Sequence, residues 1–271
     1  MTSFESATAL TLDTTESDGA SFWWEVPDGW QQGRGAWGGL VVGAAVRAAV
    51  STEPDATRSV RTLSLQISGP ALVGRHRVRV RASRIGSRMS TWAVAVSDAA
   101  DAVVATAMVI TGLPRRGAAD QDEATWSPLT APPIPPVDEV PLLSPGPPFP
   151  VFTQHFAYGA VDGLPLQGGQ AETLGWIGYR EASEWTDVTL LALVDAWFTA
   201  TLVPLSDFAP VGTVNFTANV TIDPAGLTHG EPLIHHGLVS GSRDGYASEL
   251  RRLWTSDGRL AVENVQTTVV G

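Results

Sequence analysis

The sequence predicts an α+β fold made of two similar halves, each an antiparallel sheet wrapped around one central helix. Three observations lead to this prediction. The order strand, strand, helix and then further strands occurs twice along the chain. Each copy contains one helix-like run that is apolar on most sides. A segment too rich in proline for helix or sheet separates the copies, so the predicted parts are an N-terminal half at 1–112, a linker at 113–150 and a C-terminal half at 151–271.

The first half opens with two short strands and a glycine-rich loop at 28–39 that leads into a helix. This helix, 40–50, consists of small apolar residues, which lets a sheet approach it closely. After it the hydrophobic period changes to two, with turn residues between the runs, as in an antiparallel meander. The strands expected in this half are 9–13, 20–26, 59–68, 75–83, 89–97 and 102–111.

The loop contains a G-x-G-x-x-G pattern at Gly33, Gly35 and Gly38. A dinucleotide site needs a buried strand directly before this pattern, and the preceding residues are polar and turn-like, which disfavours nucleotide binding. Two interpretations remain open. The backbone N–H groups of Gly38 and Gly39 at a helix N-terminus could hold an anion or an oxyanion, or the loop is a tight turn that feeds the helix into the core.

The linker joins an arginine pair at 115–116 and an acidic patch at 120–123 to a proline-rich stretch at 132–150. Beyond it, a long apolar run predicts a helix that starts at Thr186 or Asp187 and continues to Leu202, just before a proline. The strands expected in the second half are 151–158, 170–181, 211–222, 231–239, 245–254 and 259–270.

Asp195 is the one carboxylate inside this apolar run. Burying a carboxylate costs several kcal/mol unless it is paired or hydrogen-bonded, so its presence needs a reason. Either Asp195 is a base with a shifted pKa, or it faces a polar edge and ties down a neighbouring loop. Aligning the sequences of the two halves pairs Asp195 with Gly43 and Gln266 with Ala107. This suggests one active site and one degenerate copy.

Composition excludes several classes of function. The 271-residue chain has no cysteine, and all 17 basic residues are arginine, so thiol and lysine chemistries are absent. A net charge of −11 argues against nucleic-acid binding. With no leader-like N-terminus and no apolar run of spanning length, we expect a cytoplasmic protein without a membrane span.

Arginine is concentrated in the first half, where any anionic ligand is therefore expected to approach. Arg75, Arg77, Arg79 and Arg81 alternate along one predicted strand and so share one sheet face. Such a row could meet phosphates, but a solvated outer face is the favoured interpretation.

Four stretches together resemble a known family: Trp37-Gly38-Gly39-Leu40-Val41-Val42-Gly43, Asp195, Val211-Gly212-Thr213-Val214-Asn215 and Val265-Gln266. The chain resembles the double-hotdog acyl-CoA thioesterases of the bacterial thioesterase II type. The resemblance implies two tandem hotdog domains and a site in which an Asp, a Ser or Thr and a Gln orient a water. These map onto Asp195, Thr213 and Gln266. The chain departs from the family at Leu40, where Gln is common, and at Asn215 and Thr217, where an acidic residue and His often follow.

Apart from the resemblance, these residue types suit thioester hydrolysis, because that reaction needs an oriented water, a base and donors for an oxyanion. Asp195 is the expected base, Thr213 and Gln266 the groups that fix the water, and Gly38 and Gly39 the oxyanion donors. By strict alternation Thr213 shares a polar strand face with Asn215, and that face could equally be solvated.

No metal or organic cofactor is expected, and the five histidines lack the spacing of metal ligands. The chain also has no serine elbow, which disfavours a serine hydrolase. The expected partner is an acyl-CoA or acyl-carrier substrate in fatty acid metabolism, with a homodimer as the assembly. A hotdog protein that binds an acyl-CoA or acyl carrier without hydrolysing it is the main alternative. A dehydratase is disfavoured because neither helix offers the required Asp and His.

Overall fold

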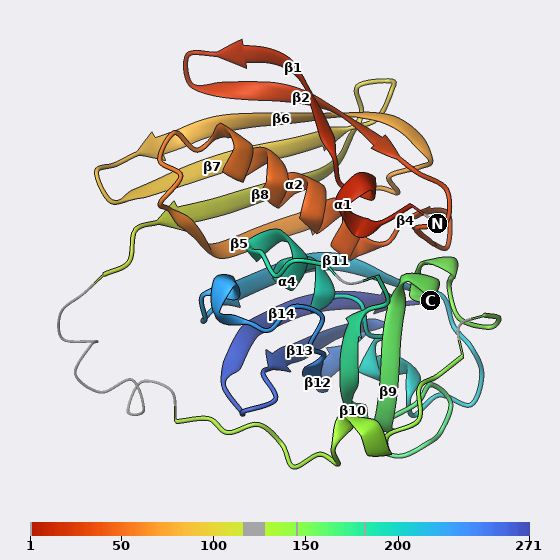
Figure 1. The fold of residues 1–271 in the computed structure, drawn as a ribbon. Coiled ribbons are helices and arrows are strands. Elements are labelled where there is room, and N and C mark those ends of the chain that lie inside the picture. The colour runs from red at the N-terminus through yellow and green to blue at the C-terminus, as the bar shows by residue number, and fades with distance from the viewer. Residues whose placement is uncertain (1, 116–127, 145, 182) are drawn as a thin grey trace.

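The computed structural model describes residues 2–115, 128–144, 146–181 and 183–271. Its main feature is one antiparallel sheet of twelve strands with two helices against one side (Figure 1). The predicted acidic patch at 120–123 and Arg116 lie outside the described residues. Within those residues no helix is long and apolar enough to cross a membrane.

The first half of the chain supplies six strands of the large sheet and its longer helix. Helix α2 spans Gly38–Thr52 and packs against the strands through a face that is almost wholly buried. A short helix, α1 (Phe4–Ala7), precedes the sheet, and the two-residue strands β3 (Gln31–Gln32) and β4 (Gly35–Ala36) form a separate hairpin. The six strands are β1 (Leu10–Glu16), β2 (Gly19–Val26), β5 (Ser59–Ile67), β6 (Gly74–Ile85), β7 (Met89–Ser97) and β8 (Val103–Gly112).

The second half supplies the other six strands and the shorter helix α4 (Asp187–Leu193). The 3-10 helix η2 (Val137–Glu139) lies within the linker, and η3 (Val151–His155) directly follows it. Two more 3-10 helices, η4 (Ala200–Leu202) and η5 (Pro224–Gly226), lie in loops of the second half. The strands are β9 (Phe156–Asp162), β10 (Glu172–Tyr179), β11 (Val211–Val220), β12 (Leu233–Arg243), β13 (Tyr246–Trp254) and β14 (Leu260–Val270).

The sheet order repeats the sequence pattern. Read outward from the centre it is β5-β8-β7-β6-β2-β1 on one side and β11-β14-β13-β12-β10-β9 on the other. Each half therefore uses its first post-helix strand at the centre and its two pre-helix strands at the outer edge. This shared order agrees with the duplication that the sequence indicates.

The sheets expected in the two halves join edge to edge, so their strands form one continuous sheet. Strands β5 and β11 pair antiparallel at the centre, from Gln66 opposite Asn215 to Thr62 opposite Asn219. Helices α2 and α4 also pack on each other, and the Asp187 Oδ2 atom accepts a hydrogen bond from the Val60 backbone N–H at 2.7 Å. One apolar core consequently runs through both halves.

The described part of the linker lies against the second half. Trp176 Nε1 donates to the Pro135 carbonyl oxygen at 2.9 Å, and Leu143 N donates to the Tyr158 carbonyl oxygen at 2.8 Å. Val140 packs in a small apolar cluster with Trp176. These contacts bring the proline-rich stretch close to the segment that contains Asp195.

Candidate active site

Asp195 lies two residues beyond the end of α4 rather than inside a helix. The predicted helix to Leu202 is wrong: α4 ends at Leu193, and the chain turns before the short η4. The carbonyl oxygens of Asp195, Ala196 and Trp197 accept hydrogen bonds from the side chains of Trp37, Tyr158 and Arg251, at 3.0, 2.8 and 3.0 Å. Because side chains satisfy these three carbonyls, the backbone leaves the helical path at this point.

The first-half helix begins at the Asp195 carboxylate. The N-terminus of α2 is Gly38, and a β-carbon there would lie 2.7 Å from Asp195 Oδ2. The Gly39 backbone N–H donates a hydrogen bond to the carboxylate. A helix N-terminus carries a partial positive charge and unpaired N–H groups, so it favours a carboxylate in this position. The structure thus brings the three predicted residues Gly38, Gly39 and Asp195 together.

Gln266, on β14, reaches the same carboxylate from the sheet. With its amide oriented so that both ends are satisfied, the nitrogen donates to Asp195 Oδ1 at 3.3 Å. The oxygen then accepts from the Arg251 guanidinium, with its nearest nitrogen at 2.6 Å. The opposite orientation would face the amide nitrogen toward that guanidinium, where neither could accept.

Thr213 joins this group through a β-bulge. Along β11, Phe216 is opposite Gln266 but Thr213 is opposite Thr268, because the register shifts between Thr213 and Asn215. The prediction that Thr213 shares a face with Asn215 is therefore wrong. The extra residue moves Thr213 to the helix side of the sheet, where its Oγ1 lies 3.4 Å from the Gln266 amide.

Sequence reasoning missed two charged residues, Glu249 and Arg251 on β13. Both are buried on the helix side of the sheet, next to Gln266. Arg251 Nη1 lies 3.5 Å from Asp195 Oδ1, and Arg251 Nε lies 3.0 Å from Glu249 Oε1. A signal was present, because alternation along β13 puts these charges on the same face as the apolar Ala247 and Leu253.

The surroundings of Asp195 raise the pKa of its carboxyl group toward neutrality. Only 5% of the residue is exposed, and this burial raises the pKa of its carboxyl group to about 6. The Arg251 charge, the Gly39 N–H and Trp37 lower that pKa, whereas the Glu249 charge raises it further. Desolvation has the largest effect, and the opposite effects of the Arg251 and Glu249 charges partly cancel.

The glycine-rich loop does not form a nucleotide site. Residues 31–36 make the β3–β4 hairpin, and the Trp37 N–H donates to the Trp30 carbonyl oxygen at 2.8 Å across it. Gly33 has a φ of 66°, a conformation that favours glycine in the hairpin turn. The pattern therefore forms a turn that leads to Gly38 at the start of α2.

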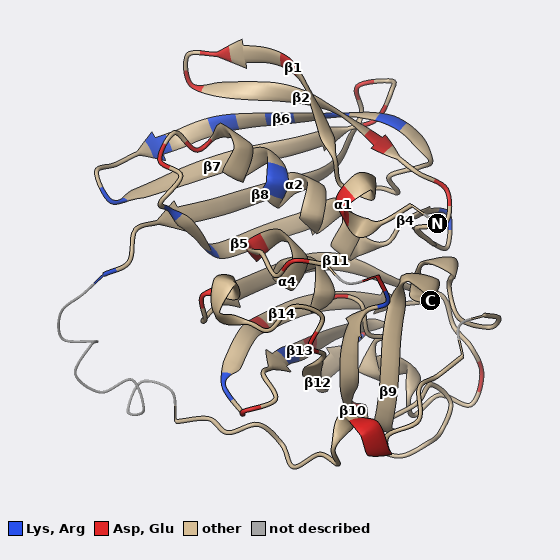
Figure 2. Cartoon of the chain, viewed as in Figure 1, with Lys and Arg blue, Asp and Glu red and all other residues tan. Residues whose placement is uncertain are grey.

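The arginine row lies along β6 (Figure 2), and its side chains contact other residues of the first half. Arg75 and Arg77 lie over the Trp23 ring, at 3.8 and 4.3 Å from its centroid. Arg79 pairs with Asp101 at 2.7 Å, and Arg81 with Glu16 at 3.3 Å. In the part of the chain that the structure describes, no three His, Asp or Glu side chains are grouped as metal ligands would be.

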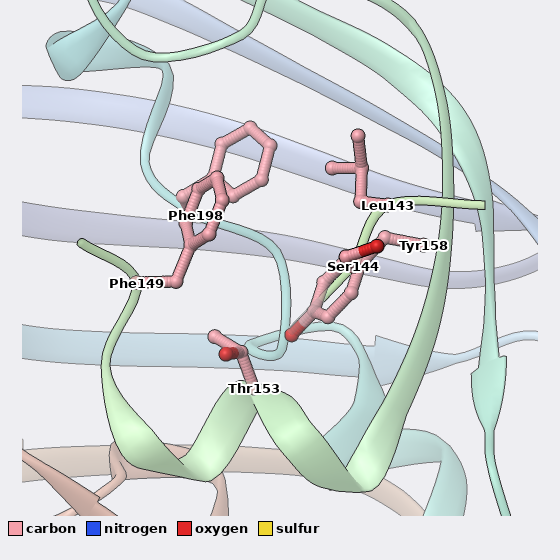
Figure 3. A pocket seen from close by; sticks show the side chains of 6 residues that line it. All are labelled: Leu143, Ser144, Phe149, Thr153, Tyr158 and Phe198. Atoms are coloured by element: carbon pink, nitrogen blue, oxygen red, sulfur yellow. The ribbon is translucent and has the colours of Figure 1, made fainter. Parts of the chain in front are cut away.

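A small apolar pocket lies beside the Asp195 segment (Figure 3). Phe149 and Phe198 stack with centroids 5.9 Å apart on one side, and Tyr158 lies on another. The Tyr158 hydroxyl donates to the carbonyl oxygen of Ala196, the residue after Asp195, so this pocket lies beside the backbone that follows Asp195. Leu143, Ser144 and Thr153 complete its lining.

Comparison with known families covers both halves. Residues 26–112 match the acyl-CoA thioesterase N-terminal domain, and residues 128–270 match the acyl-CoA thioesterase C-terminal domain. The chain belongs to the acyl-CoA thioesterase family. The family predicted from the sequence is therefore confirmed, and the C-terminal match includes Asp195, Thr213 and Gln266.

Solved structures show the same fold as this acyl-CoA thioesterase family member. A protein of unknown function with a hot dog fold from Alicyclobacillus acidocaldarius is 22% identical, with a TM-score of 0.86 over 99% of this chain and 97% of that one. A provisionally assigned thioesterase II from Thermobifida fusca is 20% identical, with a TM-score of 0.78 over 100% and 98%. An acyl-CoA thioesterase II from Mycobacterium marinum is 17% identical, with a TM-score of 0.75 over 99% and 98%. No curated protein matches the chain significantly.

Proposed function

We propose that this chain is an acyl-CoA thioesterase that hydrolyses an acyl-CoA to the free acid and CoA. The observation that carries the proposal is the buried Asp195 carboxylate, held between the N-terminus of α2 and Gln266. Hydrolysis of a thioester needs a base, an oriented water and oxyanion donors in one place. Asp195 is the proposed base, Gln266 helps to orient the water, and the N-terminus of α2 offers the oxyanion donors. The family assignment gives the substrate class.

In the proposed mechanism Asp195 accepts a proton from a water that attacks the thioester carbonyl carbon. Thr213 and Gln266 position this water, since both lie on the helix side of the sheet within reach of each other. Gly39 N–H donates to Asp195, so we assign it to fixing the base and assign the Gly38 N–H to the developing oxyanion. The tetrahedral intermediate then expels the CoA thiolate, which takes the proton from Asp195 and leaves as the thiol, so that the carboxylate is restored. This scheme needs no metal or organic cofactor.

The proposal includes the organisation of the chain. We take residues 1–112 and 151–271 as two hotdog domains that share one sheet, with 113–150 as the linker between them. The second domain contributes Asp195, Thr213 and Gln266, and the first contributes only the α2 N-terminus. The apolar pocket beside Phe198 is the proposed entrance for the acyl group. The expected homodimer, cytoplasmic location and role in fatty acid metabolism stay predictions.

The test is thiol release from short, medium and long acyl-CoA substrates, with the free acid measured by mass spectrometry. Stoichiometric CoA and free acid support hydrolysis. If the native chain binds acyl-CoA in a calorimeter but releases no thiol, the protein is the non-hydrolytic binding module and the proposed function is wrong. A dehydrated or hydrated acyl-CoA as product would indicate a different hotdog reaction.

A further inference from the structure

The buried cluster at Asp195 contains one more carboxylate than the proposed reaction uses. Glu249 is fully buried on β13, and Arg251 stands between it and Asp195. Arg251 is the only guanidinium that the structure places against either carboxylate within the described residues. Two acids therefore share one positive charge in a region where water cannot screen them.

The sharing is unequal. Arg251 donates to Glu249 through two nitrogens, Nε to Oε1 at 3.0 Å and Nη2 to Oε2 at 3.2 Å. Its closest approach to Asp195 is longer, 3.5 Å from Nη1 to Oδ1. A paired, two-nitrogen contact is the stronger kind of arginine interaction with a carboxylate. Glu249 thus takes most of the guanidinium, and Asp195 is left with the weaker contact.

Other groups keep Glu249 in this position. Thr199 Oγ1 donates to Glu249 Oε2 at 2.5 Å, and the Ala200 backbone N–H donates to Oε1 at 3.1 Å. Both donors belong to the turn that follows Asp195, at the start of η4. Both oxygens of this fully buried carboxylate are occupied by these donors and by Arg251, so we assign Glu249 no direct part in the reaction.

Arg251 also determines which way the Gln266 amide points. Three guanidinium nitrogens lie 2.6 to 3.2 Å from the amide oxygen, so the amide nitrogen must face Asp195. Without these donors the amide could rotate and present its oxygen to the carboxylate, an arrangement that repels. A buried ion pair contributes little net stability by itself, which leaves its effect on the site as the stronger reason for its presence.

We propose that Glu249 and Arg251 are positioning residues for the reaction: Arg251 fixes the Gln266 amide, and Glu249 holds the guanidinium away from Asp195 so that Asp195 remains a proton acceptor. The proposal rests on the hydrolysis proposed above. The other titratable groups near Asp195 are Tyr158 and His235. Burial raises the pKa of Tyr158 and lowers the pKa of His235, so both are neutral near neutral pH.

The test compares Glu249→Gln and Arg251→Met with a control pair on the same strands. Arg252 and Glu263 are the control because they form a partly exposed ion pair at 2.8 Å. Arg252 is next in sequence to Arg251 on β13, and Glu263 lies opposite Arg252 on β14. For each variant, kcat and KM are measured from pH 4.5 to 9. The pKa of Asp195 is measured independently by carbon-13 NMR of labelled aspartate, with Asp195→Asn to assign the signal.

In Glu249→Gln, Asp195 loses a repelling charge, so the acid limb of kcat/KM and the NMR pKa should both move down by about one pH unit. The rate on the high-pH plateau should fall about three- to tenfold because the base is weaker, with KM nearly unchanged. In Arg251→Met the acid limb of kcat/KM and the NMR pKa of Asp195 should both move up, and kcat should fall. Arg251→Lys keeps the positive charge but not the planar guanidinium with its paired donors. It should keep the acid limb near its native position and still lower kcat.

Glu263→Gln and Arg252→Met should match the native chain in every measurement. An unchanged Asp195 pKa in a folded Glu249→Gln variant would overturn the inference, as would equal shifts in the control pair. A native chain that releases no thiol removes the proposed function instead, and the NMR pKa then still decides whether Glu249 and Arg251 tune Asp195.

Discussion

Gly38 and Asp195 come from different halves of the chain, and a β-carbon on the glycine would lie 2.7 Å from the carboxylate. The start of α2 therefore contacts the candidate base with no side chain between them. This closeness lets the helix N-terminus and the Gly39 N–H stabilise the carboxylate. It also means that the site exists only where the two halves meet.

Gly38→Ala is expected to displace the Asp195 carboxylate, since atoms at that separation overlap. The predicted result is a loss of kcat/KM on the order of a hundredfold, because a misplacement of about 1 Å can have that effect. Gly226→Ala is the matched control, as a β-carbon there meets nothing within 4 Å. Equal activity of the two variants on the same acyl-CoA would show that the contact is not needed.

The bulge in β11 makes a prediction about two threonines on one strand. Thr213→Val should lower kcat about tenfold, the effect of losing one hydrogen bond to a bound water. Thr217 lies on the other face, where its Oγ1 is 3.0 Å from Ser64 Oγ, so Thr217→Val should leave kcat unchanged. Steady-state kinetics of both variants measures this. A larger loss in Thr217→Val than in Thr213→Val would contradict the assigned faces.

Asp195 should lower the stability of the protein at neutral and alkaline pH. Burial raises its pKa from 3.8 to about 6, so between these values the folded state binds a proton that the unfolded state has released. Stability falls as pH rises through this window, and above it the penalty is constant at about 3 kcal/mol. Asp195→Asn should therefore increase the free energy of unfolding at pH 8 and change it little below pH 4. Urea denaturation at the two pH values tests this, and an equal effect at both would contradict the pKa.

The apolar pocket makes a prediction about acyl chain length. Removing the Phe198 ring should widen the space beside Tyr158, so Phe198→Ala should raise the ratio of kcat/KM for long over short acyl-CoA about tenfold. Phe208→Ala is the control because Phe208 is exposed and outside the pocket. If the ratio stays constant while both variants remain active, the acyl group binds elsewhere.

Much of the fold could be predicted because the hydrophobic period reports which side of each element is buried. The repeated order of strands and helix is visible in the alternation along the chain, and the turns are marked by glycine, proline and aspartate. The length of α4 could not be predicted in this way. Its end is determined by Trp37, Tyr158 and Arg251, whose side chains bind the carbonyls after Leu193 from distant parts of the chain.

The candidate site shows the same limit. Asp195 stands out in the sequence as a carboxylate in an apolar run, whereas Gln266 is indicated by the alignment of the two halves and by the family resemblance. The face of Thr213 depends on one inserted residue in β11, which strict alternation cannot reveal. Glu249 and Arg251 look like ordinary strand charges until their partners on β14 and in the segment after α4 are placed beside them.

The most direct test of the account is the rate of CoA release at pH 8 by the native chain, Asp195→Asn and Asp187→Asn. Asp187 is a suitable control because burial also raises its pKa, yet it bonds the Val60 N–H instead of the site. We predict that Asp195→Asn loses activity by a factor on the order of a hundred or more while remaining folded, and that Asp187→Asn stays close to native. Native-like turnover in a folded Asp195→Asn variant would contradict the assignment of Asp195 as the base.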